Sequence, residues 1–235
     1  MATPADVAAY RSSQQDVVAL ARRELTVWWA MLDVSDARGV AAALEVFLSE
    51  LVAAYGDMAM TVAADWYDEQ RDQARVRGSF RASLAAALPG EQVRAVARWA
   101  AGPLFGPTNS AKALGLASGA VQRLVQQGGR DTLRRNVLDD PAEPRWARMP
   151  QGDETCAWCR MLASRGAVYL DRESAGGDDN TWHNDCDCQP VPVWRGQALP
   201  YDADRYLQEY VDARAKAGGD PKAIAAQMRD DLGVN

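Results

Sequence analysis

The sequence predicts a mainly α protein with a long helical hairpin domain, a small Cys/His-stapled α+β module and a helical C-terminal tail. Three observations lead to this prediction. Apolar residues recur every three or four positions over residues 37–75, prolines interrupt the helical pattern at residues 141 and 144, and every Cys and the single His follow residue 150. We therefore place the domains at residues 1–147, 148–195 and 196–235.

A long amphipathic helix is expected over residues 37–75. Its apolar face consists of Val40, Leu44, Phe47, Leu51, Tyr55, Met58, Val62 and Trp66. Asp36 is placed to cap this helix, because a carboxylate can accept a hydrogen bond from a free amide of the first turn. At about 1.5 Å per residue the helix would run roughly 55–60 Å, so it needs a partner along its length.

The preceding segment is expected to supply that partner. Apolar residues step by four or three over residues 17–32, and the short link 33–36 favours an antiparallel hairpin. We interpret Trp28, Trp29 and Trp66 as packing residues of the hairpin. An exposed aromatic stripe that docks a partner is the alternative.

Shorter helices are expected after the hairpin. They cover residues 83–88 with Ser83 as a cap, residues 91–101, a segment that starts at Asn109 or Ser110 and ends at Gly128-Gly129, and residues 131–138. In the tail, helices are expected over residues 202–217 and from Pro221 to residue 230. We assign Asp202, Asp204 and Asp212 to helix caps and surface positions, and the pairs Asp139-Asp140 and Asp178-Asp179 to solvated loops.

The charge of the chain is unevenly distributed. There are 26 Lys and Arg against 32 Asp and Glu, and the net charge of −6 lies entirely after residue 149. This balance argues against a dedicated nucleic-acid binder. Arg123, Arg130, Arg134 and Arg135 form a local basic cluster, which we interpret as a solvated helix face paired to acids. Contact with DNA or an acidic partner is the alternative.

Composition also bears on membranes and catalysis. No stretch approaches about 18 uncharged apolar residues, and the start of the chain lacks the basic and apolar regions of a signal peptide, so no membrane contact is expected. A single His severely limits acid–base catalysis, so we expect no enzyme. A hydrolase acting at His183 is the alternative.

The most specific motif is a cluster of Cys and His with the spacing C-x2-C-x23-H-x2-C-x-C. Its members are Cys156, Cys159, His183, Cys186 and Cys188. Two close pairs separated by a loop are typical of small structural zinc sites, in which zinc takes four ligands. We favour Cys156, Cys159 and Cys186 as ligands, with His183 or Cys188 as the fourth.

Other interpretations of the cluster stay open. The cysteines can form disulfides, pack as reduced thiols without a metal, or act as a redox C-x-x-C pair. For the zinc site, Trp158, Tyr169 and Trp182 are expected to provide a small hydrophobic cover.

The same residues resemble the phage Mu F-like (MuF) head morphogenesis family. That family has a D-x-x-C-x-x-C element followed by H-P-x-C-R-C, and the matching residues here are Asp153, Cys156, Cys159, Leu162, Gly166, His183, Cys186 and Cys188. Asn184 and Asp187 stand where the family has Pro and Arg. The variant is similar to the minor capsid proteins of tailed phages or prophages of high-GC actinobacteria.

This resemblance implies a minor capsid protein that is made in the host cytoplasm and resides inside the virion head. Members associate with the portal protein and with major capsid or scaffold proteins, and act in procapsid assembly and in DNA packaging or delivery. The first alternative is a zinc-stabilised nucleic-acid-binding module that contacts packaged DNA through the Arg cluster.

Overall fold

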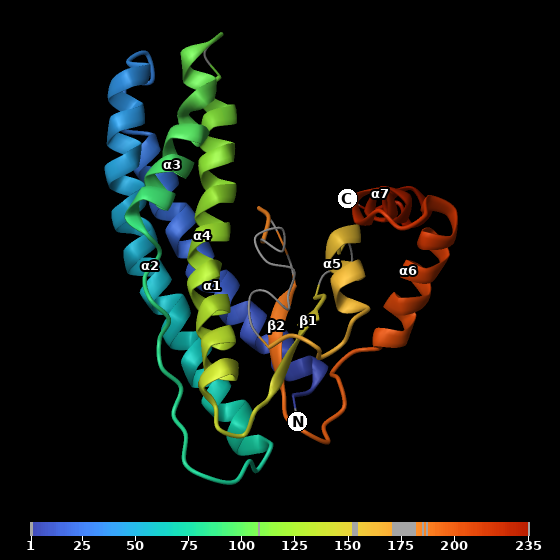
Figure 1. Cartoon of the computed structure of the whole chain (residues 1–235). Coiled ribbons are helices and arrows are strands. Elements are labelled where there is room, and N and C mark those ends of the chain that lie inside the picture. The colour runs from blue at the N-terminus through green and yellow to red at the C-terminus, as the bar shows by residue number, and fades with distance from the viewer. Residues whose placement is uncertain are drawn as a thin grey trace.

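The computed structural model describes residues 2–107, 109–151, 155–170, 182–184, 186 and 188–234. It confirms the mainly α class. Four long or medium helices form a bundle, a two-stranded sheet with a short helix follows, and two further helices close the chain (Figure 1). In chain order the elements are α1 (Pro4–Trp29), α2 (Ala37–Gln73), α3 (Gly90–Ala101), the 3-10 helix η1 (Gly102–Phe105), α4 (Ser110–Asp139), β1 (Arg145–Met149), α5 (Ala157–Ala163), β2 (Gln189–Val193), α6 (Ala203–Ala217) and α7 (Pro221–Leu232).

The predicted hairpin is present as α1 and α2. A capping box between Thr3 and Asp6 starts α1, and the Asp36 carboxylate accepts from the amide of Gly39 at the start of α2, as expected. The 37 residues of α2 correspond to about 55 Å. α1 packs on α2 and α4, whereas α2 makes its most extensive contacts with α4 and then with α3.

The packing interpretation of the tryptophans is confirmed. Trp29 and Trp66 are buried, and Trp28 stacks on Phe47 with ring centroids 4.2 Å apart. Trp66 in turn stacks on Tyr10 at 4.5 Å. These rings therefore join α1 to α2 rather than form an exposed stripe.

Helix α2 is also unusually apolar. Among the described residues it is the one helix that meets the length and composition required to cross a membrane, with an 18-residue window of mean hydropathy 1.4. A third of that window is buried inside the chain, where α2 packs on α1, α3 and α4. A central helix of a bundle has the same composition, so the absence of membrane contact stays a prediction.

The expected helix end at Gly128-Gly129 is wrong, and so is the separate helix over residues 131–138. Helix α4 is continuous from Asn109, which caps it, to Asp139. The two glycines serve close packing instead of termination. A Cβ on Gly128 would lie 3.3 Å from the carbonyl oxygen of Gly56 in α2, so the missing side chain lets the two backbones approach.

The expected helical turn over residues 83–88 is also wrong, because residues 79–89 run without helix or strand beside α4. Their polar backbone groups are satisfied by side chains of α4. The amide of Ser83 donates to Asn136 Oδ1 and its carbonyl accepts from Asn136 Nδ2, both at 2.9 Å, while the amide of Ala85 donates to Thr132 Oγ1 at 3.1 Å. These bonds replace the intrahelical bonds that the turn would have made.

Asp140 does not lie in a solvated loop, which corrects the prediction for this residue. Its side chain is fully buried and accepts from Arg71 Nε at 3.0 Å, from the Tyr67 hydroxyl at 3.1 Å and from Trp194 Nε1 at 3.2 Å. Burial raises the pKa of Asp140, but the hydrogen bonds from Arg71, the Ala142 amide and Trp194 outweigh it and leave the pKa below its usual value. The pair Asp178-Asp179 lies outside the described residues.

The sheet joins the bundle to the rest of the chain. β1 and β2 are antiparallel, with Arg145 opposite Val193 and Met149 opposite Gln189. Trp146 makes a further bridge to Tyr169. The expected boundary between residues 147 and 148 falls within β1, and the division into three domains stays a prediction.

The C-terminal helices pack against α5. Asp202 caps α6 as predicted, and a small core joins α5 to both helices through Ala157, Met161, Ala213, Ile224 and Met228. Arg160 of α5 donates to both carboxylate oxygens of Glu209 in α6 at 3.0 Å. α5, α6 and α7 thus form one side of the molecule, opposite the bundle (Figure 1).

Candidate metal centre

The structure brings the five predicted Cys and His residues together. The Sγ atoms of Cys159, Cys186 and Cys188 form a triangle with sides of 3.0–3.5 Å. The Sγ atom of Cys156 lies 3.0 Å from Nε2 of His183. Two sets of three possible ligands result, one of Cys156, Cys159 and His183 and one of Cys159, Cys186 and Cys188, and Cys159 belongs to both.

Local structure positions the first cysteine pair. Cys156 is the N-cap of α5, and its Sγ accepts from the amide of Cys159 at 3.4 Å. The first turn of α5 therefore directs the sulfur atoms of Cys156 and Cys159 to the same side of the helix. Cys186 and Cys188 lead directly into β2, whose pairing with β1 sets their position.

His183 is oriented by a second contact. Its Nδ1 lies 2.7 Å from the carbonyl oxygen of Asn184. In the neutral ring with Nδ1–H donating to this carbonyl, which is the form that binds a metal, Nε2 carries the free electron pair and faces Cys156. A ring fixed in this way by a carbonyl group is typical of metal-bound histidines.

The electrostatics of the centre favour two thiolates. Hydrogen bonds from Cys159 and then His183 lower the pKa of Cys156 to about 5, and hydrogen bonds from Cys159 and Cys188, helped by the charge of Arg130, lower that of Cys186 strongly. The hydrogen bond with Cys156 raises the pKa of His183 to about 11. The same contacts raise the pKa of Cys159, and burial raises that of Cys188.

These residues fit a metal ion. Thiolate sulfur and imidazole nitrogen are the ligands that zinc and related soft ions prefer, and three of the four sulfur atoms are buried. The chain therefore positions Cys and His groups to hold a metal. All four cysteines are free thiols in this structure. Which four of the five candidates coordinate the ion stays a prediction.

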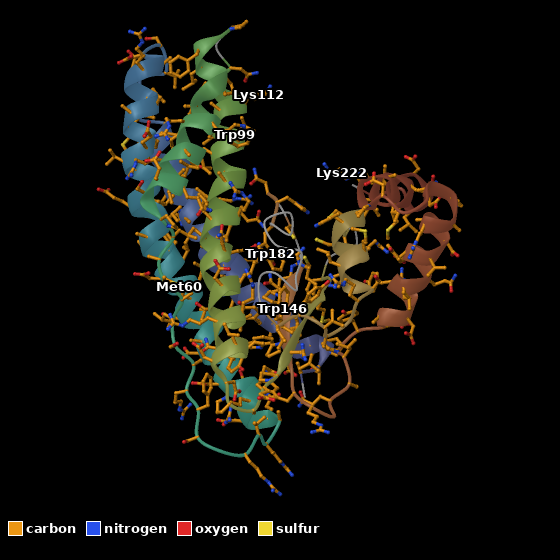
Figure 2. All side chains as sticks on the ribbon, in the orientation of Figure 1. Met60, Trp99, Lys112, Trp146, Trp182 and Lys222 are labelled. Carbon is orange, nitrogen blue, oxygen red and sulfur yellow. The ribbon has the colours of Figure 1, made fainter. Side chains whose placement is uncertain are left out.

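The predicted hydrophobic cover is correct for one residue of three. Trp182 packs on Cys159, Cys186 and Cys188. Trp158 instead packs with the helices of the tail, and Tyr169 packs on Trp146 with ring centroids 4.7 Å apart. Trp182 lies between α4 and the part of the chain that carries α5 (Figure 2).

Sequence analysis missed the role of two arginines. Arg130 was expected on a solvated or DNA-binding face, but only 1% of it is exposed, and its Nη2 donates to the carbonyls of Cys186 at 3.1 Å and Cys188 at 3.2 Å. Arg123 Nε donates to Asn184 Oδ1 at 3.0 Å. Both therefore hold the segment that carries Asn184, Cys186 and Cys188, called here the cysteine-bearing segment, on α4. Arg148 of β1 is equally buried beside Trp182.

The other two members of the basic cluster fit the solvated interpretation better. Arg134 pairs with Asp131 at 3.0 Å, and the half-exposed Arg135 pairs with Asp139 at 3.3 Å. The four arginines thus lie on different faces of α4. The sequence could not reveal this division, because it did not predict that one continuous helix carries all four.

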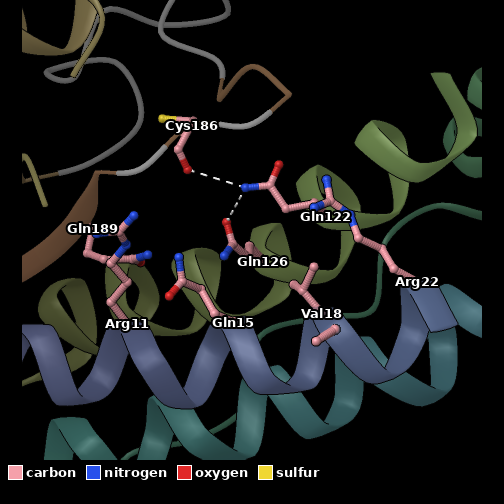
Figure 3. A pocket seen from close by; sticks show the side chains of 9 residues that line it. Arg11, Gln15, Val18, Arg22, Gln122, Gln126, Cys186 and Gln189 are labelled. Carbon is pink, nitrogen blue, oxygen red and sulfur yellow. Dashed lines mark hydrogen bonds between the residues drawn. The ribbon is translucent and has the colours of Figure 1, made fainter. Parts of the chain in front are cut away.

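A cavity of about 310 Å³ adjoins the centre (Figure 3). It lies between α1, α4 and the cysteine-bearing segment, and its lining is Arg11, Gln15, Val18, Ala19, Arg22, Gln122, Gln126, Cys186 and Gln189. On its floor, Gln122 Nε2 lies 3.1 Å from Gln126 Oε1 and 3.4 Å from the carbonyl oxygen of Cys186. The backbone of Cys186, one of the candidate ligands, is therefore in contact with amide side chains of α4.

Comparison with known proteins identifies the family. The family described as "VG15 protein" matches residues 1–213. The chain belongs to this family. The Gene 15 protein of Mycobacterium phage L5 is 30% identical over 203 residues, which are 67% of this chain and 66% of that protein. The Gene 15 protein of Mycobacterium phage D29 is 36% identical over 134 residues, 42% of this chain and 47% of that protein.

These matches confirm the coarser part of the predicted resemblance. The chain matches the VG15 family and is similar to Gene 15 proteins of two mycobacteriophages, so it is a member of a phage protein family. The matched segments span about half of the D29 protein and about two thirds of the L5 protein. No solved structure matches the chain.

Proposed function

We propose that the chain is a MuF-like minor capsid protein that associates with the portal and acts in procapsid assembly and in DNA packaging or delivery. The observation that carries this proposal is the convergence of all five residues of the MuF-like Cys/His motif in one centre, within a member of a phage protein family. The protein would be made in the host cytoplasm and reside inside the head.

The shape of the bundle suits such a role. α2 extends about 55 Å, so the bundle offers a long side to the portal, the major capsid protein or a scaffold protein. Large apolar side chains are exposed on this part of the chain, among them Met31 at 72% and Phe105 at 59%. Contact with a partner would bury them.

We propose that the metal is zinc and that its role is structural. A closed set of thiolate and imidazole ligands is typical of structural zinc sites, whereas a catalytic zinc keeps a position open for water. His183 would then be a ligand or a hydrogen-bond donor to Cys156 and could not act as the general base of a hydrolase. We accordingly propose no enzymatic activity. The DNA-binding alternative gains no support from Arg130, which is buried.

The test of the capsid role uses assembled particles. Heads are purified from cells that produce the phage, the chain is quantified in them, and crosslinks to the portal are mapped. We expect a few copies per head, with crosslinks from the bundle to the portal. As a matched pair, Phe105→Asp on the bundle and Leu207→Asp on α6 each add a charge at an exposed apolar position, and only the first is expected to reduce incorporation. Absence of the chain from heads would refute the proposal.

A further inference from the structure

Two buried arginines have no acidic partner in the described part of the chain. Arg130 and Arg148 are each 1% exposed, and no carboxylate pairs with either among the residues that the structure describes. Nε, Nη1 and Nη2 of Arg148 and Nε and Nη1 of Arg130 make no hydrogen bond there. The other buried arginines differ, because Arg71 pairs with Asp140 and Arg160 with Glu209.

Both guanidinium groups lie against the same ring. The Cζ atom of Arg130 is 4.0 Å from the centroid of Trp182, and that of Arg148 is 3.7 Å from it. Trp182 in turn packs on Cys159, Cys186 and Cys188. A cation over an aromatic face is attracted to it, but the neutral ring cannot compensate two buried positive charges.

Such charges require a nearby anion. Burying an ion without a counter-charge is costly, and in the described part of the chain the groups packed on Trp182 that can become anions are the cysteines. Neutral thiols carry no charge and would not compensate the two guanidinium groups. A divalent ion held by four thiolates carries two net negative charges, and one held by three thiolates and an imidazole carries one.

We propose that the metal–thiolate centre is the counter-ion of Arg130 and Arg148, so that metal binding fastens the cysteine-bearing segment to α4 and β1. This inference rests on the proposed metal site. A divalent ion held mainly by thiolates gives the centre a net negative charge beside Trp182, the ring that both guanidinium groups face. A soft divalent cation would thus control how firmly the segment that carries Cys186 and Cys188 is held on α4 and β1.

A second hydrophobic core, which includes Tyr67 and Leu133 of the bundle with Trp146 and Val191 of the strands, already holds the sheet on the bundle, so the metal is expected to act on the segment that carries Cys186 and Cys188. From α4, Arg130 donates to the carbonyls of Cys186 and Cys188, and Arg123 donates to Asn184. The main core of the bundle contains residues of α1 to α4 and η1 and none of the cysteines. Loss of the metal is therefore expected to loosen the attachment while the bundle stays helical.

The first experiment measures metal affinity. Zinc binding to the reduced full-length chain is measured by competition with a chromophoric chelator for the wild type, Arg148→Met and Arg148→Lys. Arg148→Met keeps an apolar stem without the charge, and we expect it to weaken zinc binding by about 10–100-fold. Arg148→Lys keeps the charge and should stay much closer to the wild type. Arg71→Met removes a buried arginine with its own partner, and should lower stability without changing zinc affinity.

The results separate the two proposals. If the wild type binds no zinc, the metal site itself is refuted and the inference falls with it. If the wild type binds zinc and Arg148→Met binds it equally well, the metal site stands and the counter-ion role is refuted. If Arg148→Met does not fold, Arg130→Met in the same assay gives the same decision.

The second experiment follows the attachment. Hydrogen exchange of the full chain is compared with zinc and after chelation under reducing conditions, together with far-UV circular dichroism. We expect faster exchange at Cys186, Cys188 and Gln189 upon chelation, with the helical signal and the protection of α1 and α2 retained. Unchanged exchange at these residues, or loss of the whole helical signal, would contradict the proposed fastening.

Discussion

Replacing Gly129 by alanine tests the close approach of α2 and α4. A Cβ on Gly129 would lie 3.0 Å from the carbonyl oxygen of Ala59 and 3.0 Å from Nε2 of Gln14. Gln14 already donates to this carbonyl at 2.9 Å. The added methyl group would therefore enter a space between two helices that is filled by a hydrogen-bonded pair.

Two effects of the substitution oppose each other. In a helix interior, alanine is more favourable than glycine by about 1 kcal/mol. Adding a methyl group to a packed core costs roughly 1–3 kcal/mol. Because one of the nearest atoms is a backbone oxygen, which can move only with α2, we expect the packing cost to exceed the gain. The free energy of unfolding of Gly129→Ala should then fall by up to about 2 kcal/mol.

Gly115 provides the matched control in the same helix. It is exposed, and a Cβ there would meet no atom within 4 Å, so Gly115→Ala should gain about 1 kcal/mol. Urea unfolding of the zinc-loaded variants and the wild type, followed by far-UV circular dichroism, measures both changes. Equal stabilisation by the two substitutions would refute the close approach at Gly129.

Three further predictions concern the buried polar contacts and the centre. Asp140→Asn should lower the free energy of unfolding by about 3–5 kcal/mol, because it leaves Arg71 buried without a counter-charge. Because the fold lowers the pKa of Asp140, the ionised carboxylate stabilises the folded state above the usual carboxyl pKa, and this stabilisation is lost as the pH falls through the folded pKa. Chemical unfolding between pH 7 and pH 3 should therefore show a smaller loss of stability in Asp140→Asn than in the wild type. Asn136→Ala should cost about 1–3 kcal/mol and speed amide exchange at Ser83, whereas unchanged exchange there would contradict the contact. Cys159→Ser removes the ligand common to both sets, so metal analysis of the reduced protein should find less zinc per chain than in the wild type.

Much of the helical architecture could be predicted because it depends on local patterns. The apolar spacing over residues 37–75 and the carboxylate of Asp36 determine where α2 lies and where it starts. The spacing of the Cys and His residues likewise predicted that they meet, since a thiolate pair on a helix turn needs a second pair to complete a site.

The errors share a physical cause, which is that the deciding partner is distant in sequence. Gly128 and Gly129 resemble a helix end until α2 is placed beside them. Residues 83–88 resemble a helical turn when read alone. Their actual hydrogen-bond partners, Thr132 and Asn136, are about 50 residues away in the sequence, so the local pattern does not show them. Arg130 could not be told from its neighbours, since only three of the 26 basic residues are lysine and arginine clusters arise by composition alone.

The buried carboxylate of Asp140 has a consequence for how this family can vary. Its donors come from α2, from the turn after α4 and from Trp194 beyond β2, so one side chain satisfies groups from three separate segments. Replacement of Asp140 by an apolar residue leaves donors unsatisfied in all three segments, and replacement of Arg71 leaves the buried carboxylate without its counter-charge. Joint replacement of the whole set by apolar side chains can be neutral. Substitutions around Asp140 are therefore expected to occur together during evolution, because a protein that carries only some of them would be less stable than one with the complete polar set or the complete apolar set.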